Sequence, residues 1–133
     1  MGIHPIVARD RDYLVSLRRH LHHHPELSMR EYETAKRIEE ELAAIGIPTQ
    51  RVGGTGVLGI LRGKGGGGKK IVLRADTDAL PIQDGKTAPY ASCNPGVSHA
   101  CGHDAHTAAL IGAARALKQL ENELRGEVDF VFQ

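Results

Sequence analysis

The chain has 133 residues, and its 17 Lys and Arg balance 16 Asp and Glu to a formal net charge of +1. So small a charge, mixed along the chain, gives no reason to expect a nucleic acid or a membrane as partner, and an aromatic content of 4% excludes the stacking platforms of single-strand binders. At this length the chain is one domain or a piece of one, and no stretch approaches the roughly 20 apolar residues of a membrane span.

The cysteines and the N-terminus indicate the compartment. Charged residues at 9–12 stand where a secretory signal would need an apolar run. Two cysteines, Cys93 and Cys101, are too few for a disulfide framework, so we expect a reducing, cytoplasmic environment. A disulfide between Cys93 and Cys101 is the alternative.

A first helix is predicted over 10–24 from apolar residues at helical spacing, and Pro25 ends it by pushing His24 out of helical geometry. Three histidines at 22–24 close this helix and suggest a metal site. However, adjacent histidines on a helix point in different directions. A solvated helix end, with imidazoles near the negative end of the dipole, explains them equally well.

A second helix is predicted over 28–45. Ser28 and Glu31 have the spacing of a capping box, and Gly46 follows the last apolar residue as a terminator. The helix carries a buried stripe, so we assign it to the core and give it no chemistry.

Apolar runs predict strands over 52–62 and 70–75, joined as a hairpin across the glycine-rich segment 63–68. The segment 82–95 is irregular and polar. A further helix and a last strand at 128–132 follow it.

Two glycine-rich segments resemble nucleotide-binding motifs. Residues 54–59 have the spacing of a dinucleotide fingerprint, and Asp78 follows at a suitable distance, but a strand continues where that fingerprint needs a helix. Residues 63–70 nearly match a P-loop, but Lys70 stands where Ser or Thr must hold magnesium, and a strand follows again. Both motifs are therefore rejected.

Two acids follow the apolar run 71–73. If the chain stays extended there, Asp76 and Asp78 point to the same side because a strand has a two-residue period. Acids at the carboxyl end of a strand lie where α/β folds place their sites. A solvated turn before Pro81 is the alternative.

The densest group of metal-ligand residue types lies at 98–107, where a loop enters the helix that continues to 120. Cys101 and His103 can reach one ion if the backbone turns sharply at Gly102, and a helix start favours thiolate over thiol. Zinc takes about four ligands. The local candidates to complete or support the set are Asp76, Asp78, Asp104 and His106.

The segments 74–81, 89–92, 94–97 and 99–107 together resemble the aminoacylase-like metallopeptidases, in the branch with hippurate hydrolase, auxin-conjugate amidohydrolases and N-acetyldiaminopimelate deacetylase. Shorter matches at 24–27, 54–57 and 130–133 extend the resemblance over nearly the whole chain. It implies an α/β fold of the zinc-exopeptidase kind, with a mixed central sheet flanked by helices. Residues 1–133 would be the N-terminal portion of that catalytic domain.

The resemblance also implies roles. Cys101 and His103 match the first two metal ligands of a two-metal amidohydrolase, with the thiolate able to bridge the ions, and Asp78 matches a supporting acid at the catalytic site. Asp76, Asp104 and His106 would support the metals or the substrate. Zinc is the expected metal, with manganese or cobalt as alternatives, and the substrate would be an N-acyl amino acid or a short peptide.

In that family, the general-base glutamate, the remaining ligands and an inserted lid or dimerisation domain follow the segment that ends at Gln133. We therefore expect no hydrolysis by these 133 residues alone, only weak metal binding, and pairing into homo-oligomers through uncovered apolar faces. The alternative is a non-catalytic remnant domain that holds a structural ion or none and acts in assembly.

Overall fold

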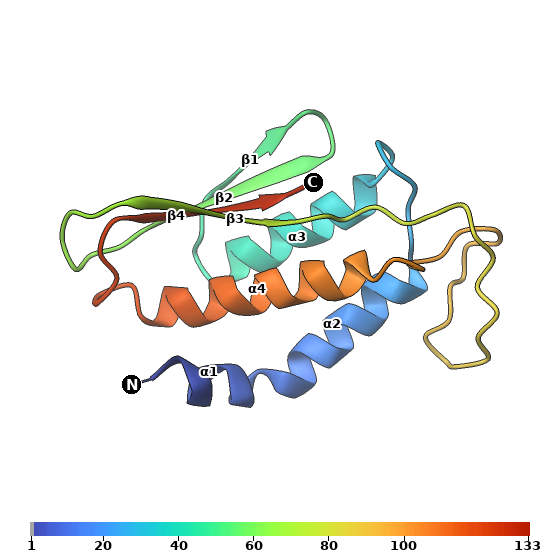
Figure 1. Ribbon diagram of the computed structural model, residues 1–133, viewed down its shortest axis with the longest axis horizontal. Coiled ribbons are helices and arrows are strands. Elements are labelled where there is room, and N and C mark those ends of the chain that lie inside the picture. Colours follow the sequence, from blue (N-terminus) through green and yellow to red (C-terminus); the bar gives the residue numbers. More distant parts are fainter. Residues whose placement is uncertain (1) are drawn as a thin grey trace.

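The computed structural model describes residues 2–133 (Figure 1). In chain order the elements are α1 (Ile3–Arg9), α2 (Arg11–His23), α3 (Tyr32–Ala44), β1 (Thr49–Val52), β2 (Gly56–Arg62), β3 (Lys70–Ala75), α4 (His103–Gln119) and β4 (Glu127–Phe132). The strands form one mixed sheet, and the helices gather on one side of it in the part of the chain described (Figure 1). The predicted α/β fold, a mixed sheet flanked by helices, is confirmed.

The sheet has the order β1-β2-β4-β3. β2 pairs with β1 and β4 antiparallel, and β3 pairs with β4 parallel. The predicted hairpin of β2 with β3 is therefore wrong, because β4 lies between them. Burial agrees with this order: Phe130 and Phe132 of β4 are fully buried in the middle of the sheet, whereas Ile71 and Val72 of the edge strand β3 are more than half exposed.

The glycine-rich segment 63–68 is consequently a crossing connection. The N–H of Gly63 donates to the carbonyl of Gly126 at 2.8 Å, and the N–H of Gly65 donates to the carbonyl of Leu124 at 2.9 Å. The segment thus packs against the turn that precedes β4. A Cβ on Gly63 would lie 2.0 Å from the carbonyl oxygen of Leu124, so this approach requires glycine.

The start of α3 also differs from the prediction. The helix begins at Tyr32, and Glu31 at its N-cap makes no side-chain capping bond, so the predicted capping box of Ser28 and Glu31 is wrong. Glu26 replaces it: one carboxylate oxygen accepts hydrogen bonds from the backbone N–H and the hydroxyl of Thr34, both at 2.6 Å. The free N–H groups at the start of α3 are thus capped by a residue that precedes the helix, and not by a residue of the predicted capping box.

The core lies between the sheet and the helices. Its central residues are at most 1% exposed, and they include Ala35, Leu42, Ile111, Ala114, Phe130 and Phe132. None of the helices over residues 2–133 is long and apolar enough to cross a membrane.

Candidate metal site

The candidate site lies where the carboxyl end of β3 meets the start of α4. Asp76 follows the last residue of β3, and His103 is the first residue of α4. Gly102 precedes the helix with φ of 85°, a left-handed conformation that glycine adopts without steric cost. The hydroxyl of Thr107 donates to the carbonyl of Asp76 at 3.1 Å and ties the two elements together.

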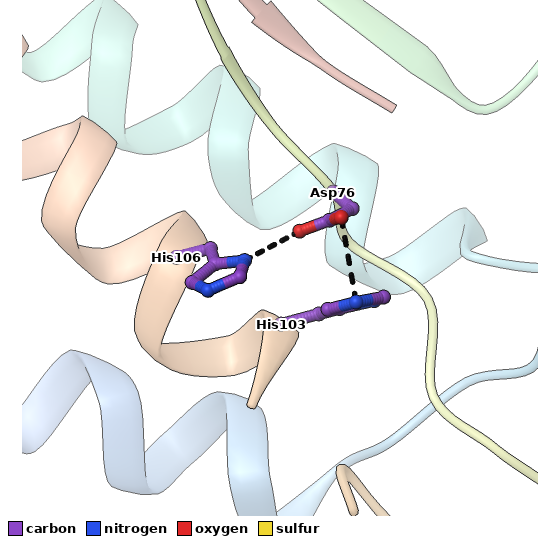
Figure 2. A group of neighbouring side chains, drawn as sticks. All are labelled: Asp76, His103 and His106. Carbon is purple, nitrogen blue, oxygen red and sulfur yellow. Dashed lines mark hydrogen bonds and ion pairs between the residues drawn. The ribbon is translucent and has the colours of Figure 1, made fainter. Parts of the chain in front are cut away.

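Both acids after β3 contact His103. Nδ1 of His103 lies 2.7 Å from Oδ1 of Asp78, and Nε2 lies 3.3 Å from Oδ2 of Asp76 (Figure 2 shows the second contact). Thr77, between the acids, is 2% exposed and points into the protein. The prediction that Asp76 and Asp78 share a side is confirmed, as the two-residue period requires.

His106, one turn further along α4, completes the group. Its Nδ1 lies 2.6 Å from Oδ1 of Asp76, and its ring stacks on that of His103 with centroids 5.6 Å apart (Figure 2). Asp76, His103 and His106 each offer a ligand atom within 4.8 Å of the others. Burial alone would raise the pKa of Asp76, but the hydrogen bond from His106 and the neighbouring imidazoles hold that pKa below its ordinary value.

Cys101 lies in the turn before α4, where its side chain is exposed. Within residues 2–133, it is not part of the ligand group that Asp76, His103 and His106 form. The pairing of Cys101 with His103 on one ion stays a prediction. Cys101 and Cys93 are both free, so the disulfide alternative is wrong.

Asp104 faces away from that group, into the protein. Its carboxylate is fully buried, and Oδ2 forms an ion pair with Nε of Arg18 at 3.0 Å. Nδ1 of His22 lies 2.7 Å from the same oxygen. On the other side of His22, Nε2 lies 3.4 Å from Oδ2 of Asp84. Backbone hydrogen bonds from Ser92 and Lys86 hold the pKa of Asp84 well below its usual range, so this acid stays ionised.

Sequence analysis missed His22. The solvated helix end proposed for residues 22–24 is wrong for this residue, because His22 is only 1% exposed. A signal existed: Leu17 and Leu21 mark the buried face of α2, and His22 directly follows Leu21 at the edge of that face. Periodicity could have placed it inside, although not its partners.

His99 lies beside this network. It is 5% exposed, and neither ring nitrogen has a hydrogen-bond partner in the described part of the chain. Burial lowers the pKa of His99, which Asp104 partly offsets. The imidazole therefore sits neutral about 6.4 Å, centroid to centroid, from His22.

The chain is similar in sequence and in fold to known hydrolases. The chain is 48% identical over 121 residues to the N-acyl-L-amino acid amidohydrolase of Geobacillus stearothermophilus, covering 90% of this chain and 32% of the relative. It is 46% identical over 125 residues to the N-acetylcysteine deacetylase of Bacillus subtilis, again covering 90% and 32%. The crystal structure of the Bacillus subtilis YXEP protein, described as a dinuclear metal binding peptidase of the M20 family, superposes with a TM-score of 0.90 at 45% identity, covering 95% of this chain and 36% of that one.

The chain thus spans about a third of the length of the curated relatives it matches. The family model for "Peptidase family M20/M25/M40" matches residues 72–133, which contain the two acids after β3 and the whole of α4. These matches cover the segments on which the resemblance to aminoacylase-like metallopeptidases was based. Through residues 72–133 the chain is similar to peptidase family M20/M25/M40, a family of hydrolases.

Proposed function

We propose that residues 1–133 are the N-terminal portion of the catalytic domain of a metal-dependent hydrolase that cleaves the amide bond of N-acyl amino acids or short peptides. The names of the relatives support the substrate class, and the dinuclear neighbour supports two metals. The single observation that carries the proposal is the contact of His103 with an acid on each of its ring nitrogens.

The residues present fit a metal. A carboxylate can only accept, so Asp78 keeps the proton of His103 on Nδ1 and leaves the Nε2 lone pair for an ion. Nε2 already points toward Asp76, whose other oxygen faces His106. This set of imidazole and carboxylate is one that zinc, manganese and cobalt accept.

In the proposed site His103 and Cys101 are the ligands that this chain supplies, and zinc is favoured because a thiolate is a soft ligand. Two such cations, when bound, lower the pKa of water and polarise the scissile carbonyl. Asp78 positions His103. Beside it, Asp76 contributes negative charge and His106 a group that can hold a proton. The general base would come from the remaining part of the protein.

The proposed compartment is the cytoplasm, because both cysteines are free and exposed, as a reducing environment allows. A homo-oligomer is also proposed, on the apolar side chains that β3 exposes at the edge of the sheet.

A chimera tests the function. This chain replaces the aligned third of the Geobacillus stearothermophilus amidohydrolase, and release of the free amino acid from an N-acetyl amino acid is measured with zinc, manganese or cobalt. We expect metal-dependent turnover that His103→Ala abolishes and that the exposed control His4→Ala leaves intact. A folded chimera that binds metal without turnover would instead support the non-catalytic alternative.

A further inference from the structure

A second group of soft ligands lies outside the candidate metal site. A cleft of about 540 Å³ runs between the end of α2, the start of α3 and the loop that contains Cys93. His20, His24 and Cys93 are among the residues that line it. The proposed amidohydrolase function uses none of these three residues.

Cys93 and His24 already stand at the separation of two ligands on one ion. Sγ of Cys93 lies 3.5 Å from Nδ1 of His24. A tetrahedral zinc ion with bonds of about 2.3 Å to sulfur and about 2.0 Å to nitrogen separates these two ligand atoms by about 3.5 Å. The pair could therefore take up an ion with little movement of either side chain.

The backbone holds this pair in place. The N–H of Cys93 donates to the carbonyl of His23 at 2.9 Å, and Nδ1 of His23 lies 2.6 Å from the carbonyl of Ala91. Asn94 adds a side-chain hydrogen bond to the carbonyl of Pro25 at 3.2 Å. Because these three contacts fasten the loop to the end of α2, the backbone that carries the thiol is already in place when a ligand arrives.

His20 supplies a third ligand from one helical turn earlier. Its ring centroid lies 4.7 Å from that of His24, and two imidazoles on one tetrahedral ion have centroids about 5 Å apart. Burial, with the positive charge of Arg37, lowers the pKa of His20, so its ring is neutral at pH 7 and offers a lone pair. In the described chain its nitrogens do not yet lie within 4.8 Å of both other ligand atoms, so the ring has to turn.

We propose that Cys93, His24 and His20 bind a soft divalent cation of the zinc class, with water completing the shell, at a site separate from that of His103. The ion would join α2 to the loop that carries Cys93. The inference rests on the geometry of this cleft and is independent of the amidohydrolase proposal.

Cobalt titration tests the site, because a cobalt–thiolate pair absorbs in the near ultraviolet. The chain has two cysteines, so Cys101→Ser leaves Cys93 as its one thiol. We expect Cys101→Ser to show a thiolate band that saturates with cobalt and is bleached by zinc. The band should disappear in the double variant Cys93→Ser, Cys101→Ser, whereas His103 and its neighbours can add no thiolate band.

The imidazoles are tested in the Cys101→Ser background. Loss of an outer-sphere partner lowers metal affinity roughly 10–100-fold. Loss of a direct ligand, in His24→Gln or in His20→Gln, should therefore lower the cobalt affinity by at least as much. His4→Gln, at an exposed position, is the matched control and should change nothing. Far-ultraviolet circular dichroism establishes that each variant folds. Absence of a thiolate band in folded Cys101→Ser, or an unchanged affinity in folded His24→Gln, would overturn the proposal.

Discussion

Nδ1 of His22 lies 2.7 Å from Oδ2 of Asp104, which joins the end of α2 to the first turn of α4 across 82 residues of sequence. Both side chains are excluded from solvent, at 1% and 0% exposed. Because Asp104 directly follows His103, this contact determines how the first turn of α4 presents its imidazoles to the acids after β3.

Replacing His22 by leucine should destabilise the fold by about 3 kcal/mol, because the buried carboxylate of Asp104 loses one of its two side-chain partners. The free energy of unfolding in urea measures the change. His4→Leu, at an exposed position, should alter stability by less than about 0.5 kcal/mol. If both variants lose the same free energy of unfolding, the contact of His22 with Asp104 does not stabilise the fold.

Asp78→Ala should lower the zinc affinity of the chain by about 10–100-fold, because His103 loses the carboxylate that orients its ring. Competition with a chromophoric chelator measures this affinity. Glu123→Ala removes an exposed carboxylate far along the chain and is the control. The positioning role of Asp78 is refuted if both variants bind zinc as the parent chain does.

Asp10 should make stability depend on acid pH. The guanidinium of Arg115 donates to both carboxylate oxygens, at 2.7 and 3.2 Å, and this hydrogen bonding holds the pKa of Asp10 below its ordinary value of 3.8 in the folded state. A lowered folded-state pKa means that the contact stabilises the fold fully above pH 3.8 and that this contribution is lost as pH falls through the lower folded value.

Asp10→Asn should therefore cost about 1 kcal/mol near pH 7, since the carboxylate is 16% exposed, and the difference from the parent should vanish toward the acid limit. Urea unfolding at a series of pH values measures it. Asp12→Asn, at a carboxylate that is 95% exposed, should show no such trend. A deficit that stays constant down to the acid limit would contradict this assignment.

Gly63→Ala should destabilise the chain by about 2 kcal/mol, because the new methyl group would overlap the carbonyl of Leu124 beside β4. Gly67 lies in the same segment with open space around it, so Gly67→Ala should be neutral or stabilising by about 0.5 kcal/mol. Thermal unfolding compares the two. If both glycines tolerate alanine alike, segment 63–68 does not pack against the turn before β4.

The edge of the sheet should promote self-association. Ile71 and Val72 of β3 are 56% and 57% exposed, and the outer edge of that strand has no neighbouring strand in residues 2–133. Val72→Lys should shift the chain toward the monomer, since a charge on an edge strand opposes pairing. Sedimentation velocity over a range of concentrations measures the shift, with Lys36→Arg as control. Concentration-independent monomers of the parent chain would remove the basis for a homo-oligomer.

Local patterns predicted much of the site. The two-residue period placed Asp76 and Asp78 on one side, and the glycine between Cys101 and His103 marked the sharp turn into α4. Both inferences hold because they depend on backbone geometry within a few residues. The predicted capping box of Ser28 and Glu31 is wrong because the cap comes from further away in the sequence. The carboxylate of Glu26, eight residues before Thr34, accepts the hydrogen bond from the N–H of Thr34 in the first turn of α3.

The sequence by itself determined which residue types gather before α4, the class of fold and the resemblance to a family, because these follow from periodicity and from local motifs. Only the tertiary structure decided which groups meet across the chain: β4 entering between β2 and β3, His22 reaching Asp104, and Cys93 facing His24. Strand order and buried pairing depend on the summed burial of segments far apart in sequence, and no local pattern encodes that sum.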